Sequence, residues 1–414
     1  MNRRMDKNRL NIGAYFLQPY ARTEQHIREL KESGIDFIIG LNDDRKTLDL
    51  FSKYGLGAVL SGVVPGWWGG DGNNAGLLEK QNPPERYTEA AQRFKDHPAV
   101  WGIDVGDEPS ALDFPYYGKV TALTEQLFPN QFAYLNLYPN YASVAENTAQ
   151  QTVNQLGTAT YDEHIRRYCA YVGLPYLSYD FYMYALSDDR TSFGGITRAL
   201  ENLRVVADAC RSTGRAMWIV LQVNSNRPEE WINKNQLRFQ ANSALAFGAE
   251  AITWGCYTAG WWHNQVLDAK GEKTEQYEKL KTVNAELHAL GGEYMKYRNV
   301  STHFIGFDGI FAPNGAKVLQ ELNTGVFFGL HMTDGSPLLA GQMVARDGSG
   351  KQAVLLCNAS EPWGERETEG TVEFSAAGSN FRILTPQGEV KPETADGKQR
   401  FCLPSCGAAL LIAE

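Results

Sequence analysis

The sequence predicts a (β/α)8 TIM barrel over residues 1–300, followed by a small antiparallel β-sandwich domain over residues 301–414. The barrel is predicted because short apolar runs alternate eight times with segments of helical period between residues 11 and 290. No GxGxxG or P-loop motif follows the first strand, which argues against the alternative fold, a doubly wound open sheet. The sandwich is predicted because the helical period disappears beyond residue 300.

Each expected strand of the barrel is followed by a loop and an expected helix. Several of these helices end at a glycine, which adopts the left-handed conformation common after a helix end. Such glycines are Gly34, Gly55, Gly214 and Gly248. The expected strands cover residues 11–18, 36–42, 57–64, 100–105, 132–138, 176–182, 217–223 and 251–256. The expected helices cover residues 23–33, 45–54, 85–95, 116–128, 163–172, 196–212, 234–247 and 275–290.

The C-terminal region shows short apolar runs separated by Gly, Asp and Pro turns, which is typical of antiparallel strands. The runs cover residues 326–330, 342–345, 353–356, 371–374, 381–384 and 408–412. We see no low-complexity linker before them, so the two domains are expected to share a fixed interface.

Composition excludes several classes of function. The net charge of -9 argues against a nucleic-acid partner, which requires clustered Lys and Arg. No apolar run is long enough to span a membrane. The six cysteines form no CxxC pair, so free thiols are expected, with a Cys402–Cys406 bridge as the alternative. No signal peptide is visible, which favours a cytoplasmic protein unless a leader has been removed. Composition indicates no oligomeric state.

Residues 101–110, with the sequence WGIDVGDEPS, are the most informative stretch. An apolar run ends in Asp107 and Glu108, so two adjacent carboxylates follow the expected fourth strand. The active site of a TIM barrel lies at the carboxyl ends of its strands, where the loops that precede the helices converge. The alternative is a helix N-terminus with Asp107 as its cap and Pro109 in its first turn.

Polar and aromatic side chains also follow the other expected strands. Each of them has an ordinary structural explanation, but together they gather at one face of the barrel. We expect Asp180 to be a second acid there. The expected substrate-binding residues at these strand ends are Asn136, Tyr138, Tyr182, Gln222 and Trp254.

Acids and aromatic platforms are what sugar chemistry requires. Cleavage of a glycosidic bond needs a protonated carboxyl as proton donor and usually a second carboxylate. Glu108 is the candidate donor, because the neighbouring Asp107 charge and partial burial would both keep it protonated. Asp180 is the candidate partner, and Asp104 is expected to support a neighbour by hydrogen bonding. Large aromatics in glycine-rich loops are candidates for stacking on sugar rings, namely Trp67, Trp68, Trp261 and Trp262.

The sequence offers no support for other chemistries. The seven histidines form no HxxxH or HExxH motif, and no GxSxG nucleophile elbow is present. An aldolase or isomerase would need a Schiff-base lysine or a metal site at a strand end, and we find neither. We therefore expect no cofactor and no metal.

The motifs also resemble a known family. The run 97–102 followed by Asp107-Glu108-Pro109 resembles the fourth strand of retaining glycoside hydrolases, in the barrel clan that includes β-galactosidases and cellulases. Segments 178–182, 218–222 and 244–254 resemble strands six to eight of bacterial glycosidases with the same barrel. The resemblance implies that Glu108 is the acid/base residue. Two positions depart from the clan's pattern, since Asp107 replaces its usual Asn and Gln222 stands where its nucleophilic Glu is expected.

These departures leave three hypotheses open. The first is a glycoside hydrolase acting on oligo- or polysaccharides, with Glu108 as proton donor and Asp180 as partner. The second follows from a resemblance of Asp107-Glu108 to hexosaminidases that use the substrate's own 2-acetamido group, in which Asp107 would orient that group. The third is a carbohydrate-binding barrel without catalysis, suggested by Gln222.

Overall fold

The computed structural model describes residues 5–6, 8–42, 44–63, 75–84, 96–142, 155–185, 194–258, 262–307, 312–364, 366–378 and 380–414. The N-terminal part is a closed barrel in which eight parallel strands pair in sequence order, from β1 to β8, and β8 pairs with β1. The strands are β1 (Asn11–Tyr15), β2 (Phe37–Leu41), β3 (Gly57–Leu60), β4 (Val100–Asp107), β5 (Phe132–Leu137), β6 (Tyr176–Phe181), β7 (Ala216–Gln222) and β8 (Ala249–Gly255). The predicted (β/α)8 fold is therefore confirmed.

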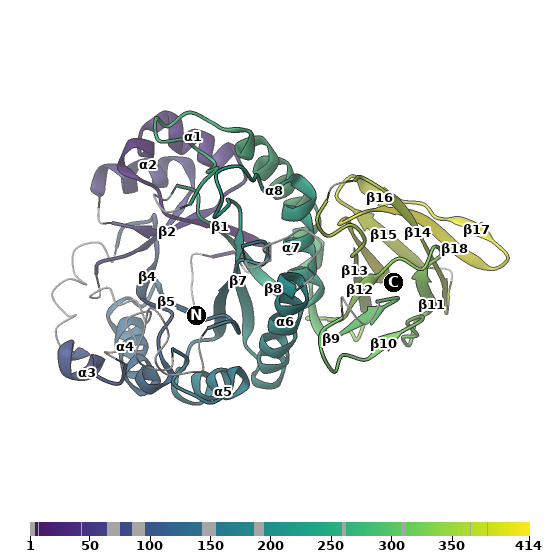
Figure 1. Ribbon diagram of the computed structural model, residues 1–414, viewed down its shortest axis with the longest axis horizontal. Coiled ribbons are helices and arrows are strands. Elements are labelled where there is room, and N and C mark those ends of the chain that lie inside the picture. The colour runs from purple at the N-terminus through teal and green to yellow at the C-terminus, as the bar shows by residue number, and fades with distance from the viewer. Residues whose placement is uncertain are drawn as a thin grey trace.

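The helices form a ring around this barrel (Figure 1). They are α1 (Glu24–Glu32), α2 (Arg45–Tyr54), α3 (Leu78–Gln81), α4 (Phe114–Leu127), α5 (Tyr161–Tyr171), α6 (Gly194–Thr213), α7 (Lys234–Ala246) and α8 (Glu275–Tyr294). The helix expected over residues 85–95 lies outside the described residues. In the parts of the chain that the structure describes, none of the helices combines the length and apolar character that a membrane crossing needs.

The C-terminal part is a sandwich of two antiparallel sheets, as predicted. One sheet has seven strands in the order β10-β9-β12-β13-β19-β15-β16, and only its β9–β10 pair is parallel. The second has four strands in the order β11-β14-β18-β17. The strands are β9 (Tyr297–Ile305), β10 (Val318–Leu319), β11 (Phe327–Met332), β12 (Leu338–Ala345), β13 (Gln352–Asn358), β14 (Glu369–Ala376), β15 (Phe381–Thr385), β16 (Gly388–Val390), β17 (Glu393–Ala395), β18 (Lys398–Pro404) and β19 (Ala408–Ala413).

The seven-stranded sheet lies between the barrel helices and the smaller sheet, so its central strands are buried on both faces. Strand β13 shows this directly, because its residues alternate between two cores. Leu355 belongs to the core shared with the barrel, whereas Val354 and Leu356 belong to the core between the two sheets. This double burial explains why β13 reads as a continuous apolar run in the sequence.

Helix α7 forms much of the contact with this sheet and is buried along most of its length. Its sequence is rich in Ala and uncharged polar residues, which suits a helix covered on two sides. Polar contacts also cross the interface, since Asn242 Nδ2 donates to the Cys406 carbonyl at 2.8 Å and Arg346 forms a 2.7 Å ion pair with Glu250. The two parts are thus joined by packing and by hydrogen bonds. All six cysteines are free thiols.

Candidate active site

The barrel interior is built in layers, because alternate residues of each strand point inward. Near the amino ends of the strands lies an aromatic layer, in which Tyr176 stacks on Trp218 at 3.8 Å between ring centroids and Phe132 packs edge-on against Trp218. Two residues further along β5 and β6, Tyr134 and Ser178 form a hydroxyl layer with a 3.0 Å hydrogen bond. The third layer carries the acids.

The acidic layer is held together by Asn136 on β5. Its Nδ2 atom donates to Asp107 Oδ1 at 3.2 Å and to Asp180 Oδ1 at 2.7 Å. Strand register places these groups side by side, since Asp107 pairs with Asn136 and Asn136 pairs with Ser178 across β4, β5 and β6. The structure therefore brings together Asp107 and Asp180, two residues predicted to take part in catalysis.

Burial shapes the protonation of these acids. It raises the pKa of Asp107 to about 6, against a smaller lowering by the Asn136 hydrogen bond. Burial also raises the pKa of Asp180 to about 8, and the neighbouring Asp107 charge raises it further. Asp180, 5% exposed, is the more deeply placed of the two. At neutral pH, Asp180 therefore holds a proton while Asp107 is largely ionised.

Asp104 lies one inward step earlier on β4. Its Oδ2 atom accepts a 2.7 Å hydrogen bond from Ser61 Oγ, and its Oδ1 atom accepts from the Gly106 N–H. Burial raises the pKa of Asp104 to about 7. The expected supporting hydrogen bond of Asp104 is thus made to the end of β3 and to its own strand.

Glu108 follows Asp107, the last residue of β4, and has an unusual backbone conformation. Its φ angle is 47°, in the left-handed region that non-glycine residues rarely occupy, and its N–H donates to the Asn136 carbonyl at 2.9 Å. No helix begins at Asp107, because the next turn starts at Ala111 and is capped by Ser110. The helix-cap interpretation of this stretch is therefore wrong.

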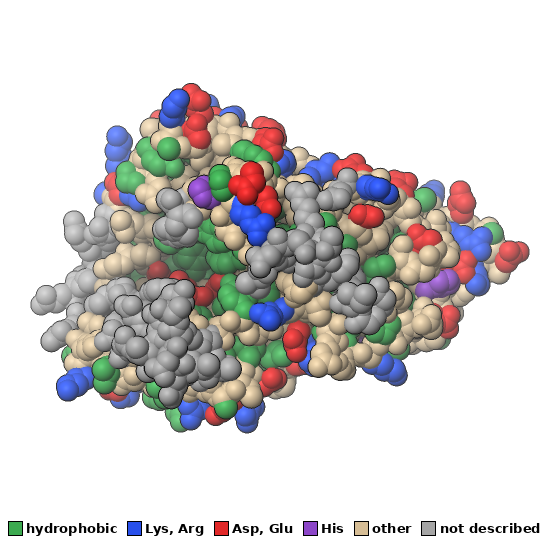
Figure 2. Space-filling model, viewed as in Figure 1, with side chains coloured by type: hydrophobic (Ala, Val, Ile, Leu, Met, Phe, Trp, Pro, Cys, Tyr) green, Lys and Arg blue, Asp and Glu red, His purple; other side chains and the backbone are tan. Residues whose placement is uncertain are grey.

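Aromatic side chains surround the acids. After burial, the Glu108 and Asp107 charges are the next largest causes that raise the pKa of Tyr138, so this phenol lies near both. Tyr182 packs edge-on against Trp262 at 5.1 Å, and the Asp180 charge helps to raise the pKa of Tyr182. Figure 2 shows acidic side chains among hydrophobic ones within a hollow on the barrel half of the molecule.

Two expected substrate-binding residues are placed differently. Trp254 is fully buried, and its indole Nε1 donates to Asn284 of α8 at 2.8 Å, so it packs between barrel and helix. Gln222 is 1% exposed, and its Oε1 atom accepts from the N–H groups of Tyr184 and Ala185. Its Nε2 atom donates to the Asn224 carbonyl. Both side chains are buried and hydrogen-bonded within the fold, and their role in substrate binding stays a prediction.

Trp67, Trp68 and Trp261 lie outside the described residues. Asn136 was expected to bind substrate, but its amide is occupied by Asp107, Asp180 and Ser178.

Several residues of the site were missed by the sequence reasoning, namely Tyr15, Tyr134, Tyr141 and Ser178. Tyr134 and Ser178 precede Asn136 and Asp180 by two residues, so the period of a strand was a usable signal for them. Tyr141 follows β5 in a loop, and its ring packs edge-on against Phe181 at 5.2 Å. No strand period predicts such a loop contact.

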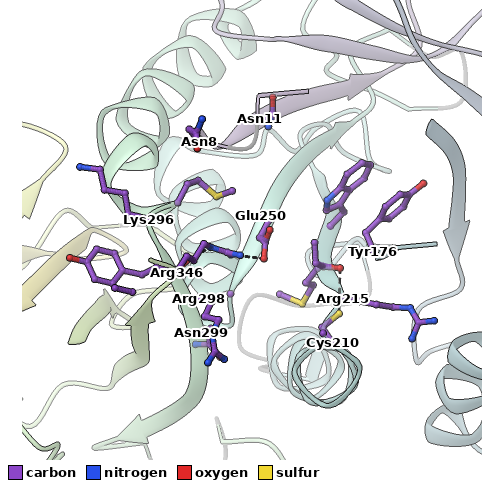
Figure 3. Close-up of a pocket in the computed structure, with 18 of the residues that line it drawn as sticks. Asn8, Asn11, Tyr176, Cys210, Arg215, Glu250, Lys296, Arg298, Asn299 and Arg346 are labelled. Atoms are coloured by element: carbon purple, nitrogen blue, oxygen red, sulfur yellow. Dashed lines mark hydrogen bonds and ion pairs between the residues drawn. The ribbon is translucent and has the colours of Figure 1, made fainter. Parts of the chain in front are cut away.

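A cavity of about 1010 Å³ lies at the opposite end of the barrel, between the amino ends of the strands and the C-terminal sheet. Figure 3 shows its polar wall, where Glu250 of β8 meets Arg346, and Cys210 lies near Arg215. The cavity does not include Asp107, Glu108 or Asp180. Among the described residues, no group of three or more His, Cys, Asp or Glu side chains is arranged to hold a metal ion.

The sequence matches no protein-family model and no curated protein. Solved structures do resemble it. One described as a glycoside hydrolase has 11% identity and a TM-score of 0.53, covering 99% of this chain and 96% of its own. A variant of a glycoside hydrolase family 5 mannosidase from Rhizomucor miehei has 12% identity and a TM-score of 0.44, covering 69% and 94%.

A Bifidobacterium dentium β-glucuronidase complexed with coumarin-3-O-glucuronide has 12% identity and a TM-score of 0.44, covering 67% of this chain and 46% of its own. Of these likenesses, the first spans the whole chain. It shows that the barrel and the C-terminal sheets together form a known architecture.

Proposed function

We propose that this protein is a glycoside hydrolase that cleaves O-glycosidic bonds of oligo- or polysaccharides, with Glu108 as the proton donor. One observation carries the proposal: Asp107 and Asp180, at the carboxyl ends of β4 and β6, share the Asn136 amide, and the next residue, Glu108, lies near Tyr138 and Tyr141. A TIM barrel places its chemistry at this end. The whole-length likeness to a solved glycoside hydrolase agrees with it in fold.

The arrangement suits an oxocarbenium-like transition state. Glu108, which directly follows the end of β4 and is partly exposed, would protonate the leaving oxygen. The Asp107 and Asp180 pair, which carries one negative charge while Asp180 is protonated, would stabilise the positive charge that develops at the anomeric carbon. The partly exposed Tyr182 and Trp262 offer aromatic surface for the sugar. A substrate contact by Tyr138, which is buried, and stacking by Trp67, Trp68 and Trp261 remain predictions.

A panel of aryl glycosides tests the proposal. Wild type should release the aryl group from at least one member, and Glu108→Gln should lower kcat/KM by about 10²- to 10⁴-fold, the usual contribution of a general acid. Glu125→Gln is the matched control, because Glu125 is exposed on α4. A Glu108→Gln protein as active as wild type would remove Glu108 from the mechanism. Sugar binding without turnover would favour a carbohydrate-binding barrel.

A second candidate is a substrate-assisted N-acetylhexosaminidase, and Gln222 favours it. Strand β7 ends in Gln222 and contains no acidic residue, so it supplies no carboxylate to act as nucleophile. The Gln222 amide is itself hydrogen-bonded to backbone groups. In this reaction Asp107 would orient the 2-acetamido group and Glu108 would be the acid. Turnover restricted to 2-acetamido aryl glycosides would support it, whereas comparable turnover of matched 2-hydroxy glycosides would exclude it.

A further inference from the structure

The hydrogen bonds behind Asn136 run in one direction. Asn136 Oδ1 can only accept, so the single Ser178 hydroxyl proton is donated to it at 3.0 Å. Ser178 must then accept from the Tyr134 hydroxyl, which in turn accepts from Tyr15 at 3.0 Å. An ionised Asp107 carboxylate can only accept, so it fixes the Asn136 amide with its NH2 group toward the acids and its carbonyl toward Ser178.

The NH2 group sets the distance between the acids. Because the two N–H bonds of a planar amide diverge by about 120°, the two accepting oxygens lie roughly 5 Å apart. At this separation the ionisation of one carboxyl opposes that of the other, so Asp107 and Asp180 titrate as one unit.

We propose that Asn136 is a positioning residue: it keeps Asp107 and Asp180 as a pair that carries one proton, and the Tyr15–Tyr134–Ser178 chain holds the carbonyl end of its amide in place. Two like charges this close inside a protein resist simultaneous ionisation. No positive side chain among the described residues offsets the burial of either acid.

The surroundings of the pair are acidic or neutral. Asp104 on β4 faces Asp107, and its charge adds to the cost of a second ionisation. The other titratable groups whose charges interact with the pair are Tyr15, Tyr134, Tyr138, Tyr141, Tyr161, Tyr179, Tyr182 and Cys256. Glu108 interacts with two of the same phenols, Tyr138 and Tyr141. Proton exchange at neutral pH therefore concerns the carboxyls alone, since the pKa values of these phenols and of the thiol are raised.

The consequence for catalysis rests on the proposed function. A pair with one proton presents a single negative charge, which matches the single positive charge that develops on the sugar ring. The protonated Asp180 can also donate a hydrogen bond to a sugar hydroxyl. Loss of Asn136 should therefore change the pH dependence of the reaction more than the binding of substrate.

The test follows the protonated-carboxyl band of the free protein by infrared difference spectroscopy, from about pH 5 to about pH 9. Wild type should show a band that persists at neutral pH and is weaker in Asp180→Asn, in which the buried Asp104 still contributes. In Asn136→Ala the midpoint of this band should rise by about 1 pH unit, because the donor bonds that favour ionisation are gone. Ser178→Ala, which keeps the amide and removes its anchor, should give a smaller rise.

Tyr176→Phe is the matched control. Tyr176 lies on the same strand and donates to the Ala133 carbonyl, outside the chain that ends at Asn136. An unchanged midpoint in both Asn136→Ala and Ser178→Ala would overturn the proposal, as would a shift in Tyr176→Phe as large as that in Ser178→Ala. The infrared measurements need no turnover. Failure to find a glycosidase substrate would therefore refute the proposed function but not the shared proton of Asp107 and Asp180. Where turnover is found, the pH at which kcat/KM falls on the basic side should rise most in Asn136→Ala and less in Ser178→Ala.

Discussion

At the scale of single residues, the site combines an unusual backbone with buried acids. Glu108 has a φ angle of 47°, and Asp104, Asp107 and Asp180 all have raised pKa values caused by burial. Both features lower the stability of the fold, and features of this kind are common at functional sites. They make stability measurements informative about the site even before a substrate is known.

The backbone at Glu108 gives the first prediction. A residue with a Cβ atom in the left-handed region destabilises the fold by about 1 to 2 kcal/mol, whereas glycine does not, because it has no Cβ atom. Glu108→Gly should therefore be more stable than Glu108→Ala by about 1 kcal/mol, as measured by urea unfolding. Both variants lose the same carboxyl group, so the comparison isolates the backbone. An alanine variant as stable as the glycine variant would show that no strain is present.

The raised pKa values give the second prediction. In the unfolded chain an aspartate ionises near pH 4, whereas folded Asp180 holds its proton up to about pH 8. The folded state thus binds more protons between these values, and stability falls as pH rises through this window. We expect Tm to be several degrees higher at pH 5 than at pH 8, measured by thermal unfolding.

Asp180→Asn tests the source of this dependence. The amide does not titrate, so the fall in Tm between pH 5 and pH 8 should be smaller in this variant. A Tm that rises across the window in wild type would mean that Asp180 is ionised in the folded protein.

At the scale of elements, three neighbouring strands position the acids, and one helix joins the barrel to the C-terminal sheet. The register of β4, β5 and β6 aligns Asp107, Asn136 and Ser178 in adjacent positions. Helix α7 connects this barrel to the seven-stranded sheet, and β12 of that sheet lies against its C-terminal end. The closeness of β12 depends on Gly341.

Gly341 gives the third prediction. A Cβ atom at this position would lie 2.2 Å from the Ala246 carbonyl oxygen, a backbone atom that cannot easily move aside. Gly341→Ala should lower the free energy of unfolding by about 2 kcal/mol, the usual cost of overpacking. Gly378→Ala is the control, because nothing lies within 4 Å of its added Cβ. Equal stability of the two variants would show that β12 can shift away from α7.

At the scale of the whole molecule, barrel and sandwich share a continuous core. Leu339, Met343 and Leu355 of the C-terminal sheet belong to the same buried cluster as Leu237 and Leu245 of α7. The ring of helices and the sheet lie against each other along α6, α7 and α8 (Figure 1). A large apolar interface of this kind couples the two parts energetically.

This coupling gives the fourth prediction. Calorimetry should show one cooperative unfolding transition for the full chain, because unfolding either part exposes the shared core. A chain ending at residue 296 should aggregate, since the apolar side chains of α7 would face water. Two separate transitions would show that the domains are independent despite their contact.

Much of the fold was predictable from the sequence. The eight strands and seven of the expected helices were recognisable, because glycines end several helices and apolar runs mark the strands. Strand β9, with the sequence YRNVSTHFI, was missed because its polar residues hide the strand pattern. Strand β18 was missed for the same reason. The site was predictable only in part, since the positions of Asp107, Glu108 and Asp180 follow from strand ends.

The sequence by itself determined the barrel, the C-terminal sandwich and the end of the barrel where the acids gather, because hydrophobic period and turn residues act locally. Only the tertiary structure decided which side chains face inward. Barrel strands are buried on both faces, so the sequence around Trp254 does not show whether its side chain points into the barrel or toward the helices. The bridge of Asn136 between Asp107 and Asp180 likewise depends on the register of three strands, a long-range property that no local pattern encodes.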